Sequence, residues 1–137
     1  MRFKKTTEYA IRVMVYLAKN NQERFSVNAL HQELQIPYKY LGRLMHTLAN
    51  AGLVEVTQGK QGGYQIVRDL ATIYLYHIVG VVEGLDDYQR CVLGFPECSN
   101  DNPCSLHYIW LERQESIKEM IYNTTLADLN GSAHTKY

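Results

Sequence analysis

A glycine-rich segment, TQGKQGG at residues 57–63, limits more than any other feature what this chain can fold into. Two runs with high β-propensity flank it, LVEV at 53–56 and YQIV at 64–67. Glycines at positions 59, 62 and 63 permit a tight turn and a close approach to another backbone. The sequence therefore predicts a two-stranded hairpin in the first half of the chain.

Helical periodicity precedes the hairpin in three stretches. The first covers residues 6–19, and Thr6 or Thr7 is predicted to cap its start. Ser26 is the predicted N-cap of a short second helix. Pro37 opens a third helix, which ends at Gly52. The second and third helices have helix-turn-helix spacing, and the apolar positions that face the core are Ala10, Val13, Met14, Leu17, Leu30, Leu34, Leu41, Leu44, Met45 and Leu48.

Three helices followed by a hairpin predict a winged helix-turn-helix domain over residues 1–83, so the fold class is mainly α with a small β-wing. In this architecture the third helix enters the DNA major groove and the wing reaches an adjacent groove or the backbone. The charge distribution agrees, because residues 1–70 hold ten Lys and Arg against five Asp and Glu, whereas residues 71–137 hold four against nine. The candidate DNA contacts are Ser26, Tyr38, Lys39, Tyr40, Arg43, Gln58, Lys60, Gln61 and Gly62.

Two features weigh on this interpretation. Trihelical units with a hairpin also serve as protein-interaction modules, and a surface Lys or Arg is usually only solvated. The location of the positive surplus on the motif favours DNA. Gly42 lies inside the third helix, where glycine costs on the order of 1 kcal/mol relative to alanine. Either something approaches the backbone closely there, or the helix tolerates the cost.

All three cysteines fall between residues 91 and 104, and a histidine follows them. The spacing is Cys91-x6-Cys98-x5-Cys104-x2-His107, and the intervening Gly, Pro and Asn residues predict a loop. The chain has no apolar run of about 18 residues and no secretory signal at its start, so a cytoplasmic protein without membrane attachment is predicted. In a reducing cytosol, an odd number of close thiols indicates metal binding or redox chemistry rather than structural disulfides.

Other chemistries compete for these residues. Zinc is the main one, because three cysteines and a histidine also form a structural zinc set, although the short Cys-x2-Cys knuckle and redox motif are missing. The alternative function is a zinc or iron-sulfur module for interaction or electron transfer that binds no DNA. An enzyme is not predicted, because the sequence shows no Ser/His/Asp arrangement and Lys60 is followed by Gln61 rather than the Ser or Thr of a P-loop.

The second half of the chain predicts a dimerisation element. Residues 76–83 predict a short apolar helix, in which His77 is a core or boundary residue. Residues 84–104 form the predicted cysteine-rich loop, 105–129 a long dimerisation helix with its end, and 130–137 a disordered tail. The helix is free of Gly and Pro from 105 to 123, and its apolar face is Leu106, Ile109, Trp110, Ile117, Met120 and Ile121.

Several segments together resemble a known family. They are MRF at the start, EYAIR at 8–12, IPYKYL at 36–41, AGLV at 51–54, the wing QGKQGGY at 58–64 and VVEG at 81–84. In this order they are similar to the IscR and NsrR family of iron-sulfur transcription regulators, the Rrf2 type, from residue 1 to about 129. The resemblance implies that Cys91, Cys98 and Cys104 bind an iron-sulfur cluster and that a homodimer binds a palindromic operator in double-stranded DNA.

Two residues compete as the fourth cluster ligand. His107 matches the three-cysteine, one-histidine pattern of the members that bind a [2Fe-2S] cluster, and it is the favoured candidate. Glu8 matches a carboxylate that other members donate from the partner subunit's first helix, although a first-turn carboxylate more commonly interacts with the helix dipole. The resemblance thus favours [2Fe-2S] and leaves [4Fe-4S] possible. It implies a repressor whose operator affinity depends on the state of the cluster.

Overall fold

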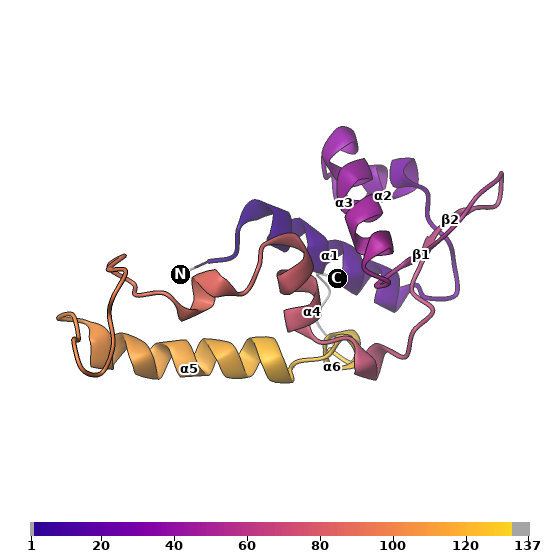
Figure 1. The fold of residues 1–137 in the computed structure, drawn as a ribbon. Helices are drawn as coiled ribbons and strands as arrows, with labels where there is room; N and C mark the ends of the chain where they lie inside the picture. Colours follow the sequence, from indigo (N-terminus) through magenta and orange to yellow (C-terminus); the bar gives the residue numbers. More distant parts are fainter. Residues whose placement is uncertain (1, 133–137) are drawn as a thin grey trace.

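The computed structural model describes residues 2–132 and is mainly helical, with one small antiparallel sheet (Figure 1). This confirms the predicted fold class. Helices α1 (Lys5–Lys19), α2 (Val27–Leu34) and α3 (Tyr38–Asn50) precede the hairpin of β1 (Glu55–Thr57) and β2 (Gly63–Gln65). The elements that follow are η1 (Leu70–Thr72), α4 (Leu75–Val82), η2 (Asp86–Gln89), α5 (His107–Asn123) and α6 (Leu126–Asn130).

The main core lies between the helices of the N-terminal part, as the apolar periodicity predicts. Each of α1, α2 and α3 turns its apolar stripe inward, where burial of side chains such as Met14 and Leu48 removes apolar surface from water. Leu126 of α6 joins the same core, so α6 packs against the winged domain. The fully buried large side chains are Met14, Leu17, Leu30, Leu34, Ile36, Leu41, Met45, Leu48, Ile73, Ile78, Ile121 and Leu126.

Both strands of the wing are shorter than the sequence predicts, and both lie closer to the turn. Leu53 and Val54, expected in the first strand, are buried in the helical core, so pairing starts at Glu55 opposite Gln65. Gly62 is required sterically, because a Cβ there would overlap the Thr57 carbonyl oxygen. The hairpin is anchored to the loop before α2 by a backbone bridge between Phe25 and Tyr64.

The start of α1 differs from the prediction. The N-cap residue is Lys4, so neither Thr6 nor Thr7 caps the helix. The Thr7 side chain is fully buried, and its hydroxyl donates a hydrogen bond to the Glu83 carboxylate. Ser26 does cap α2 as predicted, since its Oγ accepts a hydrogen bond from the Ala29 amide at 3.1 Å.

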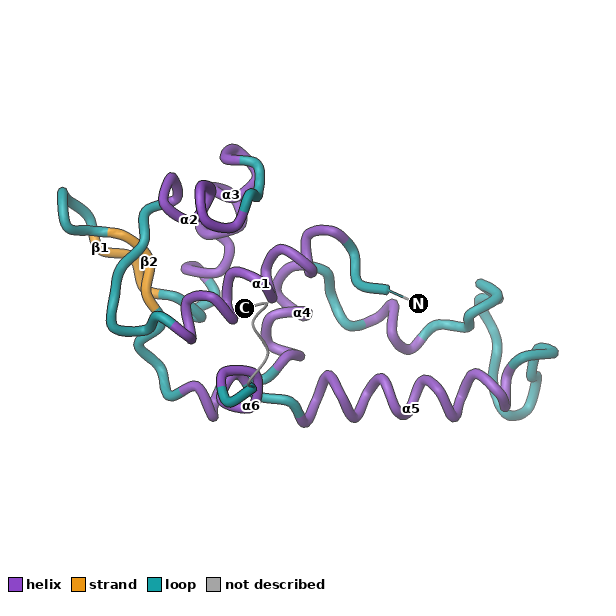
Figure 2. Tube along the Cα trace, turned by 180° about the vertical axis from the view of Figure 1, so that it is seen from behind, coloured by secondary structure: helices purple, strands orange, loops and turns teal. Residues whose placement is uncertain are grey.

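Helix α5 extends away from the winged domain and carries the cysteine loop at its far end, opposite the wing (Figures 1 and 2). Its other end is tied down, because the amides of Leu75 and Leu126 donate to the carbonyls of Thr124 and Ile73 at 2.9 and 2.8 Å. The helix stops at Asn123, and Thr125 caps a separate helix, α6. Residues 105–129 are therefore not one continuous helix.

The predicted disordered tail, residues 130–137, begins inside a helix. Asn130, the first residue of the predicted disordered tail, closes α6, while residues 133–137 of that tail lie outside the described residues. Within residues 2–132, no helix combines the length and apolar character that crossing a membrane requires.

Candidate cysteine centre and nucleic-acid interface

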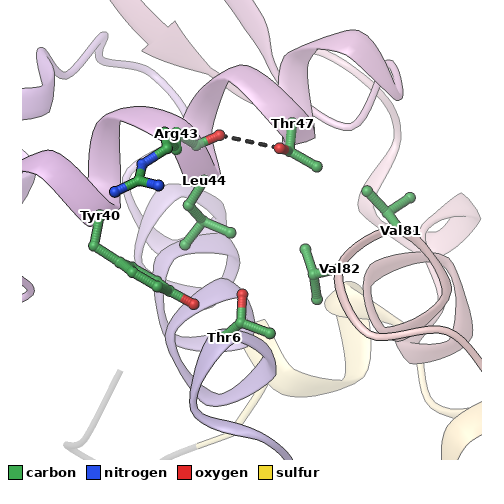
Figure 3. A pocket seen from close by; sticks show the side chains of 7 residues that line it. All are labelled: Thr6, Tyr40, Arg43, Leu44, Thr47, Val81 and Val82. Carbon is green, nitrogen blue, oxygen red and sulfur yellow. Dashed lines mark hydrogen bonds between the residues drawn. The ribbon is translucent and has the colours of Figure 1, made fainter.

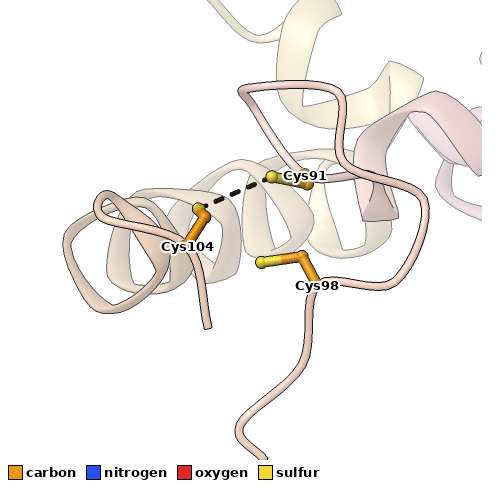
Figure 4. Close-up of side chains that lie close together, drawn as sticks. All are labelled: Cys91, Cys98 and Cys104. Carbon is orange, nitrogen blue, oxygen red and sulfur yellow. Dashed lines mark hydrogen bonds between the residues drawn. The ribbon is translucent and has the colours of Figure 1, made fainter. Parts of the chain in front are cut away.

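The three cysteines converge on one point although they are separated along the loop between η2 and α5 (Figure 4). Their Sγ atoms all lie within 4.8 Å of one another, and those of Cys91 and Cys104 are 3.6 Å apart. All three thiols are free and half-buried. A hollow of about 320 Å³ beside them is lined by Phe95, Pro96, Glu97, Cys98, Asn102, Pro103 and Cys104.

The loop backbone prepares one of these thiols for ligation. Desolvation acts to raise the pKa of Cys91, yet hydrogen bonds from the backbone at Phe95 and Leu93 lower this pKa to about 7. The pKa of Cys98 is raised, because desolvation and its neighbours Cys104 and Cys91 outweigh a backbone hydrogen bond at Cys104. Thiolates are the form that binds metals, so Cys91 reaches this form at a lower pH than Cys98.

His107 reaches this group through Cys98. It is the first residue of α5, and its Nδ1 lies 3.2 Å from the Cys98 Sγ. Its Nε2 lies 2.8 Å from the Oδ1 of Asn100, a carbonyl-type oxygen that only accepts hydrogen bonds. A proton on Nε2 satisfies this contact, and in a neutral ring it leaves the Nδ1 lone pair facing the thiols. Asn100 was not selected from the sequence, and its contact with His107 depends on the loop path rather than on any local motif.

Glu8 lies elsewhere in the same chain. Its carboxylate pairs with Lys5 at 3.3 Å and with Arg2 at 3.4 Å. The hydrogen bond from Lys5 lowers the pKa of Glu8, as does the nearby Arg2, while desolvation opposes them. Glu8 is not a member of the cysteine group within one subunit, so its predicted ligation requires the partner subunit.

The predicted recognition helix is α3. Tyr38, Lys39 and Arg43 are exposed on it, as expected of groups that reach DNA. Tyr40 is half-buried instead, because its ring packs edge-on against Tyr9 of α1 with the ring centroids 5.4 Å apart. Tyr40 and Arg43 also border a cavity of about 320 Å³ between α1, α3 and α4 (Figure 3), whose other lining residues are Thr6, Leu44, Thr47, Val81 and Val82.

The wing presents its polar side chains to solvent. Gln58, Lys60 and Gln61 are exposed, whereas Gly62 is half-buried and serves the turn. A polar hollow of about 480 Å³ runs from the wing to the loop between α1 and α2, and its lining residues are Gln22, Glu23, Arg24, Lys60, Gln61, Gly62 and Gln65. Arg24 was missed by the sequence reasoning. The signal for it was a cation two residues before the Ser26 cap, in a loop that the hairpin meets at Phe25.

Comparisons with known proteins agree with this arrangement. The model of the Rrf2 family, described as an iron-dependent transcriptional regulator, matches residues 3–131. The chain is 30% identical over 130 residues to the HTH-type transcriptional regulator IscR of Xenorhabdus nematophila, which covers 94% of this chain and 79% of that protein.

Two solved structures have the same fold. CymR, the global cysteine regulator of B. subtilis, superposes with a TM-score of 0.78 at 27% identity and covers 95% of this chain and 96% of its own. T. potens IscR superposes with a TM-score of 0.74 at 26% identity and covers 98% and 89%. The family match over nearly the whole chain, with the winged fold beneath it, shows that this chain belongs to the Rrf2 family of DNA-binding transcriptional regulators.

Proposed function

We propose that this regulator senses an iron-sulfur cluster and that its operator affinity depends on the state of that cluster. The observation that carries the proposal is the convergence of three free thiols within 4.8 Å, on a loop next to the long helix of a DNA-binding fold. The iron-dependent character of the matched family supports it as well.

The residues around the thiols fit such a group. Iron-sulfur clusters are held by thiolates, and histidine replaces cysteine at some of them. Cys91, Cys98 and Cys104 would supply the thiolates, and His107 would supply its Nδ1 nitrogen. Three thiolates and one imidazole favour [2Fe-2S] over [4Fe-4S] in this proposal. The partner's Glu8 is the competing fourth ligand.

The operator is proposed to be palindromic double-stranded DNA bound by a homodimer. A two-fold dimer presents two α3 helices, which read half-sites about one helical turn, roughly 34 Å, apart. The long helix α5 is the proposed dimerisation element, because it leaves apolar side chains such as Ile109 and Met120 in solvent. Exposed basic groups on α3 and the wing, Lys39, Arg43 and Lys60, would contact phosphates or guanine edges.

The chain's own residues provide a link between the two sites. A bound cluster would supply chemistry that responds to oxidation, nitric oxide or iron supply. A cluster held by the thiols and His107 would fasten residues 91–107 to the start of α5, and in the proposed dimer α5 would set the distance between the two recognition helices. A change of a few kcal/mol in the stability of this loop is enough to alter operator occupancy strongly. We propose repression as the output.

The cofactor is tested by purifying the protein without oxygen. We expect a coloured dimer whose native mass gives the cluster type and stoichiometry in one measurement. A colourless sample that contains zinc and lacks charge-transfer absorption would overturn the cluster and favour a structural metal site.

The DNA function is tested by selecting bound duplexes from a random-sequence library with the coloured protein. We expect a palindromic consensus whose binding weakens steeply with salt, as phosphate contacts require. Equal affinity and footprint of the coloured and cluster-free proteins on that duplex would overturn the proposed coupling. Failure to enrich any sequence in either state would argue against operator recognition itself.

A further inference from the structure

A chain of polar contacts joins the cysteine loop to helix α1. At its centre is Glu83, the C-cap residue that follows α4. One carboxylate oxygen of Glu83, Oε2, accepts hydrogen bonds from the Thr7 hydroxyl at 2.5 Å and from the Tyr88 hydroxyl at 2.9 Å. Thr7 is fully buried and Tyr88 is 4% exposed, whereas Glu83 is half-buried, so both donor residues lie in the interior. One oxygen thus joins α1, α4 and η2.

The contacts continue from Tyr88 toward α5 and the cysteines. The Tyr88 carbonyl accepts a hydrogen bond at 2.7 Å from the side chain of Gln114, a polar residue that is 7% exposed on α5. The Arg90 carbonyl accepts one at 3.3 Å from the Trp110 indole. Arg90 directly precedes Cys91. The segment η2 and the residue after it are therefore held by Glu83 on one side and by α5 on the other, directly before the cysteine loop begins.

Ion pairs and a ring contact connect the same elements as these hydrogen bonds. Asp87 of η2 pairs with Lys4, the N-cap of α1, at 3.0 Å and with Arg90 at 3.1 Å. The ring of Tyr88 also meets that of Phe3 edge-on, with centroids 6.1 Å apart. Exposed ion pairs contribute little to stability, so the hydrogen bonds from the buried residues Thr7 and Tyr88 to Glu83 are the stronger tie.

Helix α1 connects onward to the recognition helix. Tyr9, two residues after Thr7, packs edge-on against Tyr40 of α3. Arg12 donates a hydrogen bond at 3.1 Å to the carbonyl of Leu34, the last residue of α2. A displacement at the start of α1 is therefore transmitted to both helices of the helix-turn-helix pair, since packed side chains do not deform continuously.

We propose that Tyr88, Glu83 and Thr7 are positioning residues that couple the cysteine loop to the recognition helix within one subunit. The proposal rests on the proposed cluster function, and it adds a route that does not pass through the dimer interface. When the loop is fastened, Arg90 and η2 are held, and Tyr88 and Thr7 share the Glu83 oxygen. When the loop is released, η2 loses the support of the loop at Arg90, and this bond network loosens at α1.

Amide hydrogen exchange of the full-length protein tests the route without DNA. In the wild type, we expect removal of the cluster to speed exchange in residues 84–90 and also in the first half of α1, by about fivefold or more. In Tyr88→Phe, removal of the cluster should still speed amide exchange in residues 84–90, but exchange in α1 should no longer change. Thr7→Val removes the other bond to Glu83 and should have the same effect.

Two variants serve as matched controls. Glu83→Gln keeps a carbonyl oxygen that accepts two hydrogen bonds, so the response of α1 should be retained. Tyr122→Phe makes the same chemical change as Tyr88→Phe at an exposed position of α5, and it should also behave as the wild type. All variants should keep the visible absorption of the wild type.

The outcomes separate this proposal from the function on which it rests. A wild-type protein without cluster absorption overturns the proposed function, and this is seen in the spectrum before any exchange is measured. If amide exchange in α1 of the wild type does not change when the cluster is removed, only the intrasubunit route is overturned. The same holds if both Tyr88→Phe and Thr7→Val leave the response of α1 at the wild-type size.

Discussion

At the scale of single residues, His107 and Glu8 differ in the contacts that their side chains already make. His107 has its Nε2 on Asn100 and its Nδ1 toward Cys98, so a ligating nitrogen is oriented before any metal arrives. Glu8 is engaged by two cations of its own subunit. To ligate across a dimer, its carboxylate would have to exchange these pairs for an iron.

Replacing the two candidates separately distinguishes them. We expect His107→Ala to weaken cluster retention by at least about tenfold and to change the visible spectrum, because it removes the oriented nitrogen. Glu8→Gln should leave both unchanged. Iron and sulfide content and absorption after anaerobic purification give the answer, and the opposite pattern would assign the fourth position to the partner's Glu8.

Gly42 provides a second residue-scale prediction. A Cβ at this position meets no heavy atom within 4 Å, so nothing in the described chain requires a glycine there. Gly42→Ala should therefore raise the free energy of unfolding by about 0.5–1 kcal/mol, because alanine is the better helix former. Gly52→Ala, at a position with φ of +76°, should lower it by about 1–2 kcal/mol.

Thermal and denaturant unfolding of both glycine variants measure these shifts. A destabilised Gly42→Ala would mean that the helix is strained in a way its local geometry does not reveal. If the variant is stabilised but binds the selected duplex more weakly, the DNA backbone approaches α3 at this glycine.

At the scale of elements, the sequence predicted helices better than strands. Apolar periodicity located α1, α2 and α3 because their buried faces follow the 3.6-residue repeat. The strand boundaries shifted because Leu53 and Val54 have β-propensity yet are taken up by the helical core. The break before α6 had a local signal, Thr125 followed three residues later by Asp128, which form a capping box.

The wing and α3 carry a prediction about DNA. Lys60→Ala and Arg43→Ala should each weaken binding to the selected duplex, and each should reduce the magnitude of the salt slope by about one if the cation contacts a phosphate. Lys118→Ala on α5 is the control, because it removes a similar charge far from the wing. Bleaching of the visible absorption by either DNA-face variant would contradict the division of roles between wing and cysteine loop.

The start of α4 carries a prediction about pH. Burial, with a smaller contribution from Arg68, lowers the pKa of His77 below 6.5, and the neutral Nδ1 accepts a hydrogen bond from the Tyr74 amide at 3.0 Å. As the pH falls, His77 is therefore protonated at a higher pH in the unfolded chain than in the folded one. The free energy of unfolding should fall as pH drops below about 6.5 and level off below the folded-state pKa.

A variant isolates this titration from the others. In His77→Gln the side chain keeps a hydrogen-bond acceptor and loses the titrating ring, so the fall between pH 7.5 and 5.5 should be smaller than in the wild type. Urea unfolding at a series of pH values measures the difference. Identical slopes in the two proteins would show that His77 is not responsible.

At the scale of the whole molecule, the order of parts could be predicted from the sequence, whereas their contacts could not. Cys91, Cys98 and Cys104 are close in sequence, so their convergence needed only a loop. Thr7 and Glu83 are 76 residues apart, and no local pattern pairs them. Such a contact depends on how α1 and α4 pack, which the periodicity of either helix does not determine.

The dimer is a prediction at this scale. Ile109 and Met120 are 62% and 45% exposed and lie on one side of α5, since eleven residues bring a helix back to within about 20° of the same direction. Ile109→Glu and Met120→Glu should convert the proposed dimer to a monomer and weaken binding to a palindromic duplex. Light scattering after size-exclusion chromatography measures the mass. A wild type that is already monomeric would refute the proposal, and Glu115→Gln on another side of α5 is the control.

The attachment of α5 at its Thr124 end makes the helix a lever. A helix of 17 residues is about 25 Å long, so a tilt of about 5° at the pivot corresponds to a displacement of about 2 Å at the cysteine end. The reverse also holds, because a small displacement of the thiols produces a still smaller displacement near the winged domain. Trp110 and Gln114 make contacts part of the way along α5. These contacts therefore determine how much of the displacement reaches η2 and how much is absorbed by the loop.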